Sequence, residues 1–377
     1  MQKKPTLKNS RIVEILAERM MQGVYLPGSR LPAERDLASE FALDRSAVRA
    51  ALAELTRTGQ IVREPGCRPR VSPAAGIRSA PRSRPRPVSR TIAVILPQHA
   101  ADHGSREIMR GIAHVLHSRE AAFRPLMFDL NLRTAPRGVL ERQACEAILE
   151  EDIAGAIVWP TLEPGSLDGW RGVQSAGRPV VFVDRCDDDF LCDFVGVDNY
   201  DAAKDATQFL LDQGHTRIVH LTRDLPASSV AQRIDGYRDA LTDAGLPFSS
   251  AQVWSLPTKA FSQSVDEFAV RLLALDPPPT AVFAVNDQIA HTLIAALEVR
   301  GKTVPGDISV LGFDDDDQHS ARPALLTTVR QPFERIGQRA AALLLRRLGP
   351  APPPAYQHVL LPTVLVERST CRLLETG

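Results

Sequence analysis

The chain has few cysteines for its length, and they are scattered. Its 377 residues include five cysteines, and no two of them form a C-x-x-C pair. This pattern excludes a disulfide framework and a structural zinc site of paired cysteines, and it is typical of a reducing compartment. No run of about 18 uncharged apolar residues occurs either, so we expect a soluble protein that does not enter a membrane and is not exported. The sequence therefore predicts a cytoplasmic location.

The motifs of several enzyme classes are also missing. The first apolar segment is not followed by G-x-G-x-x-G, and neither G-x-x-x-x-G-K-[ST] nor G-x-S-x-G occurs. These absences remove support for a dinucleotide-binding enzyme, a P-loop nucleotide hydrolase and a serine hydrolase. His99 and His103 have i, i+4 spacing, but they follow a strand end that need not be helical, so we expect no metal there. We predict no enzyme activity, no cofactor and no metal.

Charge is unevenly distributed along the chain. Residues 1–90 contain 18 Lys and Arg against 8 Asp and Glu, whereas residues 91–377 contain 27 against 37. The formal net charge of zero therefore combines a basic head with an acidic body. Because neutralising phosphates releases condensed counterions, the head is expected to bind nucleic acid. The length of the chain predicts two or three domains.

The head has the periodicity of three short helices. Apolar residues at helical spacing predict one helix between residues 10 and 23, a second from about Pro32 to before Asp44, and a third from Asp44 to about Thr58. The apolar stripe of the third helix is expected to contain Val48, Leu52 and Leu55. Another side of this helix carries Arg45, Ser46 and Arg49.

This arrangement suits contact with DNA. A short helix, a tight turn and a second helix with an exposed N-terminal half place side chains against base edges in the major groove. The alternative is a solvated helix face that happens to carry two arginines. The next segment favours DNA binding, because residues 60–63 and 68–71 predict two strands joined by a turn over residues 64–67.

The segment from Ile12 to Pro73 contains GVYLPGSRLPAERDLASEFALDRSAVRAALAELTRTGQIVREPG and resembles the winged helix-turn-helix of the GntR family. The hairpin departs from the usual wing pattern G-x-G-[ST]-[FY]-V and carries two extra arginines that favour phosphate binding. The resemblance and these arginines together give the expected DNA-binding residues, which are Arg35, Arg45, Ser46, Arg49, Gly66 and Arg68.

The basic segment AAGIRSAPRSRPRPVSR, residues 74–90, has no apolar periodicity and predicts an extended linker between residues 1–73 and 91–377.

In the body, short apolar runs alternate with helical segments. The runs predict buried strands at 91–97, 154–159, 179–184, 217–222, 280–285 and 308–313, and the helical segments are 106–118, 138–150, 200–213, 233–245, 265–275 and 287–300. This α/β alternation predicts doubly wound parallel sheets, divided between two lobes.

Polar residues follow several of these strands. Asp184 and Arg185 follow one, Asn286 and Asp287 another, and a run of carboxylates beginning at Asp314 a third. Ligands of doubly wound sheets bind beyond the carboxyl ends of the strands, and paired acceptors and donors suit a polyhydroxylated ligand. Asp287 has an alternative role as the N-cap of the following helix, whereas a ligand role is favoured for Asp314.

The segments VGVDNYDAAKDATQFLLDQGHTRIVHL, RIDGYRDALTDAGL, TAVFAVNDQIAHTLIAALEVRGKTVPGDISVLGFDD and PALLTTVRQPFERIGQRAAALLL resemble the effector-binding core of the LacI/GalR repressors, which is similar to periplasmic sugar-binding proteins. The resemblance implies a first lobe near 91–198 plus 327–347, a second near 199–326 plus 348–377, and a ligand between them. Its implied effector contacts are Asp184, Arg233, Asn286, Asp314, Gln331 and Phe333. Residues 103–105 offer no aromatic ring where relatives often have one.

The sequence therefore predicts a transcriptional regulator, more specifically a repressor. We expect it to bind a pseudo-palindromic double-stranded DNA operator as a homodimer, because two heads related by a two-fold axis read such a site. A sugar or sugar derivative is the expected effector. The alternative is a sugar-binding module, or an enzyme on a doubly wound fold, without a role in DNA regulation.

Overall fold

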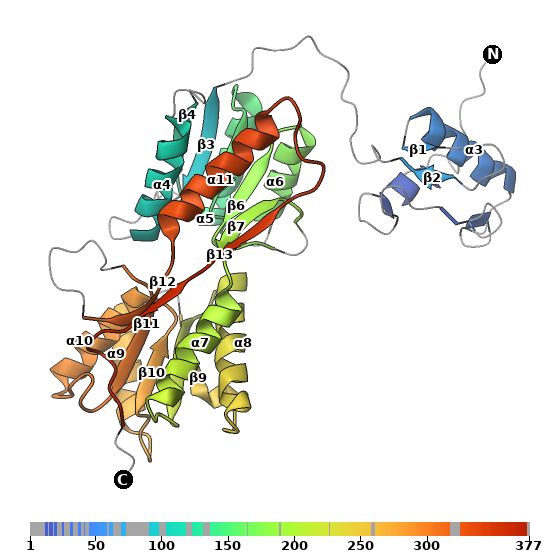
Figure 1. The fold of residues 1–377 in the computed structure, drawn as a ribbon. Coiled ribbons are helices and arrows are strands. Elements are labelled where there is room, and N and C mark those ends of the chain that lie inside the picture. Colours follow the sequence, from blue (N-terminus) through green and yellow to red (C-terminus); the bar gives the residue numbers. More distant parts are fainter. Residues whose placement is uncertain are drawn as a thin grey trace. The chain divides into compact units, whose positions relative to one another are not determined.

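A computed structural model gives the fold in two units, residues 1–87 and 88–377 (Figure 1). Each unit is considered by itself. The structure describes residues 12–13, 15–17, 19–20, 25, 31–32, 37–38, 41, 45–58, 60–62, 69–72, 90–97, 103–117, 123–130, 136–163, 165–187, 190–225, 227–257, 261–316 and 325–374.

The first unit packs helical segments against a two-stranded hairpin. Helix α3 (Arg45–Arg57) precedes β1 (Ile61–Val62) and β2 (Arg70–Val71), which pair antiparallel with Ile61 opposite Val71. The helical residues described between 12 and 20 contribute Ile12 and Leu16 to the core that α3 completes. The predicted third helix and wing hairpin are therefore confirmed.

The second unit contains two six-stranded sheets. The first sheet is parallel throughout, in the order β13 (His358–Leu361), β7 (Asp193–Val197), β6 (Val180–Val183), β5 (Gly155–Val158), β3 (Thr91–Leu96) and β4 (Arg124–Asp129). The second has the order β14 (Val364–Val366), β12 (Thr327–Arg330), β11 (Ser309–Asp314), β10 (Ala281–Ala284), β8 (Ile218–Arg223) and β9 (Val253–Leu256), with only β14 antiparallel to its neighbour.

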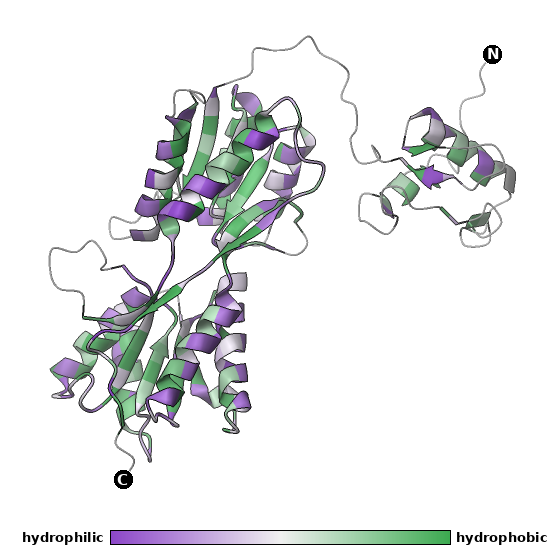
Figure 2. Cartoon of the chain, in the orientation of Figure 1, coloured by the Kyte–Doolittle hydropathy of each residue, from purple (hydrophilic) through white to green (hydrophobic). Residues whose placement is uncertain are grey.

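Helices cover both faces of each sheet. Successive residues of a strand point to opposite faces, so each sheet contributes to two apolar clusters. Figure 2 shows apolar strands enclosed by helices whose outer faces are hydrophilic. One face of the first sheet is covered by α4 (His103–Leu116) and α11 (Phe333–Leu348), and the other face by α5 (Arg137–Glu150) and α6 (Ser166–Ser175). One face of the second sheet is covered by α7 (Asn199–Asp212) and α8 (Ser228–Asp243), and the other face by α9 (Phe261–Leu273) and α10 (Asp287–Val299). A short 3-10 helix, η1 (Ser250–Gln252), precedes β9.

Two glycines allow α4 and α11 to touch along their backbones. A Cβ on Gly111 would lie 2.0 Å from the carbonyl oxygen of Glu334, and one on Gly337 would lie 2.0 Å from that of Ile108. Real Cβ atoms do not approach so closely, so any side chain at either position would push the helices apart. These helices therefore form one tightly packed pair on the face of the first sheet.

The six predicted strands are confirmed as β3, β5, β6, β8, β10 and β11, and the predicted helices match α4, α5 and α7 to α10. The prediction omitted β4, β7, β9, β12, β13 and β14, together with α6 and α11. Four of the omitted strands lie at sheet edges, where a strand needs fewer apolar residues. Three predicted helix starts were late, because α4 begins at His103 rather than at residue 106, α8 at Ser228 rather than at Arg233, and α9 at Phe261 rather than at residue 265.

The lobe boundaries also differ from the expected ones. Strand β12 was assigned to the first lobe but pairs with β11 in the second sheet. Strand β13 was assigned to the second lobe but pairs with β7 in the first sheet. The chain passes between the sheets at residues 197–199, as predicted, but also at 330–333 and 361–364, and these two crossings lie within segments that the sequence prediction assigned whole to one lobe.

Candidate functional site

Helix α3 separates an apolar face from a basic one in the first unit. Val48, Leu52 and Leu55 are fully buried in the core. Arg49 is exposed on the helix. Arg45 and Ser46 open α3, but their side chains lie outside the described part of the structure, as do residues Arg35, Gly66 and Arg68. For these five predicted DNA contacts the structure gives no side-chain placement.

A second set of polar residues gathers at the carboxyl ends of strands in the second unit. Strands β6, β8, β10 and β11 each end in or are followed by such residues. Gln331 and the apolar Phe333 follow β12, where the chain leaves the second sheet, and Arg233 comes from α8. We call this set the strand-end cluster, and its members are Asp184, Arg185, Arg223, Arg233, Asn286, Asp314, Gln331 and Phe333.

Arg233 lies at the centre of the contacts in this cluster. It is only 6% exposed on α8, and its Nε donates to Oδ1 of Asn199 at 2.9 Å. Its Nη1 donates to the carbonyl oxygen of Val285 at 2.5 Å, and its guanidinium carbon lies 3.6 Å from the ring centre of Phe313. Burial lowers the pKa of Arg233, whereas the charge of Asp314 raises it. The guanidinium is thus fixed in one position by the second lobe.

Asp314, the last residue of β11, is the acidic counterpart. Its Oδ1 accepts a hydrogen bond from Nε2 of Gln331 at 2.8 Å and lies 3.9 Å from Nη2 of Arg233. The φ angle of Asp314 is 119°, a conformation that side chains rarely adopt. Backbone strain of this kind is concentrated at functional sites. Sequence reasoning had proposed these three residues as ligand contacts, and the structure brings them together.

On the first sheet, Asp184 follows β6 with a φ angle of 69° and is 6% exposed. Its Oδ2 accepts a hydrogen bond from Nε of Arg185 at 3.1 Å. Burial lowers the pKa of Arg233, and the charge of Asp184 on the other lobe opposes this lowering, after that of Asp314. The two lobes are also in direct contact, because the backbone N–H of Cys186 donates to Oγ of Ser228 at 3.3 Å.

The sequence left Asp287 two alternative roles, as a ligand contact or as the N-cap of the following helix, and the structure shows neither. Asn286 is the N-cap of α10, and its Oδ1 accepts from the N–H of Ile289 at 3.0 Å. Asp287 is buried and accepts from Oγ1 of Thr328 at 2.6 Å and from the N–H of Asp316 at 2.9 Å. Asp287 is therefore neither the cap nor a free ligand group. It ties β12 to the segment after β11.

Phe333 opens α11 beside the first sheet. Its ring is 6.3 Å from that of Trp159 and 6.3 Å from that of His103. Trp159 follows β5, and the guanidinium of Arg185 lies 5.7 Å from its ring centre. Sequence reasoning missed Trp159, although it ends the apolar run AGAIVW just before a proline. Trp159 therefore brings an aromatic ring from the end of β5 to the side of Phe333.

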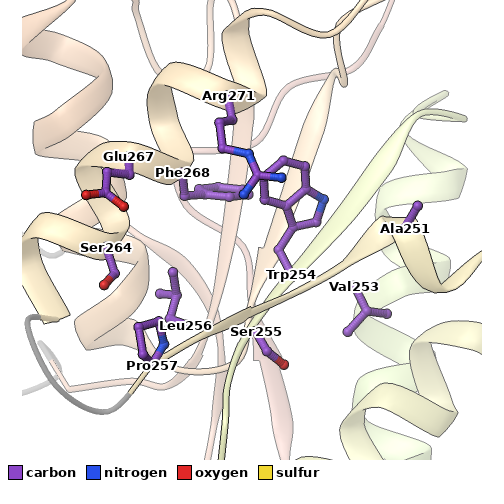
Figure 3. Close-up of a pocket in the computed structure, with 10 residues that line it drawn as sticks. All are labelled: Ala251, Val253, Trp254, Ser255, Leu256, Pro257, Ser264, Glu267, Phe268 and Arg271. Carbon is purple, nitrogen blue, oxygen red and sulfur yellow. The ribbon is translucent and has the colours of Figure 1, made fainter.

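A cavity of about 410 Å³ lies at the edge of the second sheet, between β9 and α9 (Figure 3). Its wall includes Trp254 and Arg271, whose guanidinium carbon is 4.3 Å from the indole ring centre, and Phe268, which meets the indole edge-on. All of its lining residues come from residues 251–271 of one lobe. None of the predicted effector contacts borders it, so we do not assign the sensing function to this cavity.

Replacing Asp314 with asparagine should change how the stability of the ligand-free protein depends on pH. Burial raises the pKa of Asp314 well above 3.8, against the effect of Arg233 and with the help of Asp316 and Asp287. Such a carboxyl contributes stability below its ordinary pKa and loses it as the pH rises through the folded pKa. The free energy of unfolding of Asp314→Asn, relative to that of the natural protein, should therefore increase as the pH rises above ~4.

Urea unfolding at pH values from about 2.5 to 8 measures this difference, and Asp307 provides a control of opposite sign. Hydrogen bonds from the backbone and hydroxyl of Thr303 lower the pKa of Asp307 to about 2. Asp307→Asn should be less stable than the natural protein above pH ~4, with a difference that shrinks as the pH falls toward 2. An Asp314→Asn variant that loses relative stability between pH 4.5 and 8 would contradict the expectation.

Two family models match separate parts of the chain. Residues 8–71 match bacterial regulatory proteins of the gntR family. Residues 207–371 match the periplasmic binding protein-like domain. None of the described helices is long and apolar enough to cross a membrane.

One similar protein covers nearly the whole chain, and others match a part of it. An arabinose metabolism transcriptional repressor of Geobacillus stearothermophilus is 25% identical over 353 residues, 92% of this chain and 93% of that protein. The HTH-type transcriptional repressor PurR of Vibrio campbellii is 32% identical over 168 residues, 45% of this chain and 50% of that protein. A solved LacI family transcriptional regulator from Enterococcus faecium, with bound ribose, has a TM-score of 0.64 and 26% identity, covering 76% of this chain and 100% of that one. These similarities confirm both resemblances found in the sequence.

Proposed function

We infer that this chain, in which a gntR-type DNA-binding domain is joined to a periplasmic binding protein-like core, is a transcriptional repressor controlled by a sugar or sugar derivative. The observation that carries the proposal is the presence of both parts in one chain, each with an intact core and with a set of buried polar residues at the strand ends of the second. The relatives named above are themselves regulators. We propose no catalytic activity for the chain.

The proposed ligand lies between the two lobes at the strand-end cluster. Arg233 offers a fixed planar set of donors, and Asp314 and Gln331 offer acceptors and donors at hydrogen-bonding distance from each other. Such groups match vicinal hydroxyls. Asp184 and Asn286 complete the polar wall, and Phe333 supplies an apolar one. These roles follow from residue chemistry and placement.

The proposed DNA contacts are Arg45, Ser46 and Arg49 of α3, Gly66 and Arg68 of the predicted wing, and Arg35 in the predicted helix before α3. Residues 1–73 form the DNA-binding part in this proposal, residues 74–90 the linker and residues 91–377 the sensing core. The protein acts as a homodimer, because two heads are needed to read a pseudo-palindromic operator with useful affinity. The ligand binds one of two arrangements of the lobes more tightly and therefore increases the population of that arrangement. Because the two arrangements differ in their affinity for the operator, ligand binding changes operator affinity.

In vitro selection from a random DNA library tests the proposal. The full-length protein should enrich one sequence with two-fold symmetry, and a sugar or sugar derivative should change the affinity for that sequence by about 5- to 150-fold. Mobility-shift titrations at fixed salt, with and without each compound, measure the effect. If selection enriches no sequence, the chain is not a sequence-specific regulator. If a symmetric sequence is enriched but no compound alters its binding, the sensing part of the proposal is wrong.

A further inference from the structure

Helix α11 carries a row of arginines on its exposed side. Arg335, Arg339 and Arg346 are exposed, and their spacing of four and seven residues places them on one side of the helix. We call these three residues the arginine row. Within the described part of the chain, none of the three forms an ion pair. Because like charges at i, i+4 destabilise a helix, Arg335 and Arg339 lower the stability of the core when nothing is bound to them.

The neighbouring acidic residues do not neutralise the arginine row. Helices α4 and α11 together contain six arginines and two glutamates, although residues 91–377 as a whole contain 27 Lys and Arg against 37 Asp and Glu. Both glutamates, Glu107 and Glu334, pair with Arg110 of α4, at 2.7 and 2.5 Å. Asp193 pairs with Arg347, which follows the row, at 2.6 Å. A local positive charge on an otherwise acidic core attracts a negatively charged partner.

A groove with an apolar floor includes two residues of the arginine row. It has a volume of about 450 Å³ and is lined by Val115 of α4, by Arg335, Gln338, Arg339 and Ala342 of α11, and by Val359 and Leu361 of β13, the edge strand of the first sheet. The four apolar side chains are all half-buried, so part of their surface is open to an occupant. An apolar centre bordered by arginines is the typical composition of a protein–protein interface.

This composition favours a protein over two other occupants. The phosphates of DNA would pair with the arginines but would not use the apolar floor. A second copy of the chain, with this face at the two-fold axis, would place the same arginines opposite each other, which is unfavourable. An acidic segment with one apolar side chain matches both the charge of the arginine row and the floor of the groove.

We propose that the groove between α11 and β13 is a docking site for an acidic segment of a partner protein, in which one apolar side chain enters the groove and neighbouring Asp or Glu carboxylates pair with Arg335 and Arg339. Arginine binds a carboxylate by two parallel hydrogen bonds, which gives such a pair a defined geometry. The proposal goes beyond regulation by a sugar, since the groove shares no residue with the strand-end cluster. The two sites are nevertheless connected, because α11 begins at Phe333 in that cluster.

Selection from a displayed library of short random peptides tests the proposal on the full-length protein. We expect the enriched peptides to share an apolar residue flanked by Asp or Glu, because such a sequence carries both features that the groove recognises. The enriched peptides are then synthesised with a fluorescent label. Fluorescence anisotropy at one salt concentration measures their affinity for the natural protein and for its variants.

Two variants and a matched control locate the peptide. The double variant Arg335→Gln with Arg339→Gln removes two charges and should weaken the binding of an enriched peptide by about tenfold or more. Ala342→Lys adds a positive charge but fills the groove, so it should weaken binding as well, whereas an effect of charge alone would strengthen it. The control, Arg142→Gln with Arg171→Gln, removes two exposed arginines from the other face of the same sheet and should leave the affinity unchanged. All four arginines are exposed, so their replacement should leave the fold intact.

Each outcome decides the question. An acidic peptide that is weakened by both changes on α11, and not by the control, supports the proposal. A peptide that the control weakens as strongly, or that Ala342→Lys binds more tightly, overturns it, because the effect would then be one of charge alone. Enrichment of no acidic sequence also overturns it. If the double variant on α11 then loses affinity for DNA of unrelated sequence and the control does not, the arginine row binds phosphates instead. None of these outcomes affects the proposed sugar-sensing function.

Discussion

Replacing Arg49 with alanine should weaken the binding of the selected operator by about 100-fold or more. An arginine that contacts a base edge contributes about 1–3 kcal/mol, and a symmetric operator engages two copies of the head. Arg49 is exposed on α3, on a side of the helix that the buried Val48 and Leu52 do not occupy. The loss should be largest for the operator and smaller for unrelated DNA, which reads only the charge.

Arg57→Ala is the matched control for this experiment. Arg57 lies on the last turn of the same helix, is exposed, and pairs with Glu54 at 2.5 Å. Its removal takes away the same formal charge but should change operator affinity by less than about threefold, since exposed ion pairs contribute little. Equal losses from Arg49→Ala and Arg57→Ala, measured by mobility shift at one salt concentration, would mean that α3 does not read the operator.

Replacing Arg233 should abolish the stabilisation of the protein by its ligand. At a ligand concentration about 100 times the dissociation constant, the natural protein should gain about 2.7 kcal/mol of stability. A 100-fold weaker variant would gain only about 0.4 kcal/mol at the same concentration. We expect this loss because Arg233 is fixed by Asn199 and Val285 with its guanidinium near Asp314, so no other described side chain takes that place.

Two variants and a control make this measurement decisive. Arg233→Ala leaves buried partners without a donor and should lower the free energy of unfolding by about 3 kcal/mol even without ligand. Arg233→Lys keeps the charge but loses the planar set of donors, so it should retain the fold and still lose the ligand effect. Arg238→Gln removes an exposed arginine of the same helix that pairs with Asp235 and Asp239. Thermal unfolding with a full ligand-induced shift in Arg233→Lys would exclude Arg233 from binding.

The buried centre of the fold was predictable because its signal is strong and local. Runs such as TAVFAV are buried on both faces and recur between helical segments, so six central strands were found within a residue or two of their true ends. Edge strands were missed because a strand with one neighbour tolerates exposed and polar residues. Strand β13, for example, alternates exposed and half-buried residues, and β4 begins with Arg-Pro.

The candidate site was predictable where single residues follow strong strands, as at Asp184 and Asp314. It was less predictable where the role of a side chain depends on a distant partner. Asp287 could be placed at a helix start from the sequence, but its bond to Thr328, 41 residues away, could not. Trp159 has the same limitation, because its neighbours Phe333 and Arg185 come from other elements. Long-range pairing is a property of the fold rather than of any local pattern.

The close backbone contact at Gly111 and Gly337 has a mechanical consequence. No side chain separates α4 from α11 where these glycines meet, so the two helices cannot slide past each other without a clash and should move as one body. Helix α11 begins at Phe333 in the strand-end cluster and runs 16 residues, a length of about 24 Å. If a ligand displaces Phe333, the whole of α11 should therefore move with α4 as a rigid body, and Leu348 at the other end of the helix should move as well.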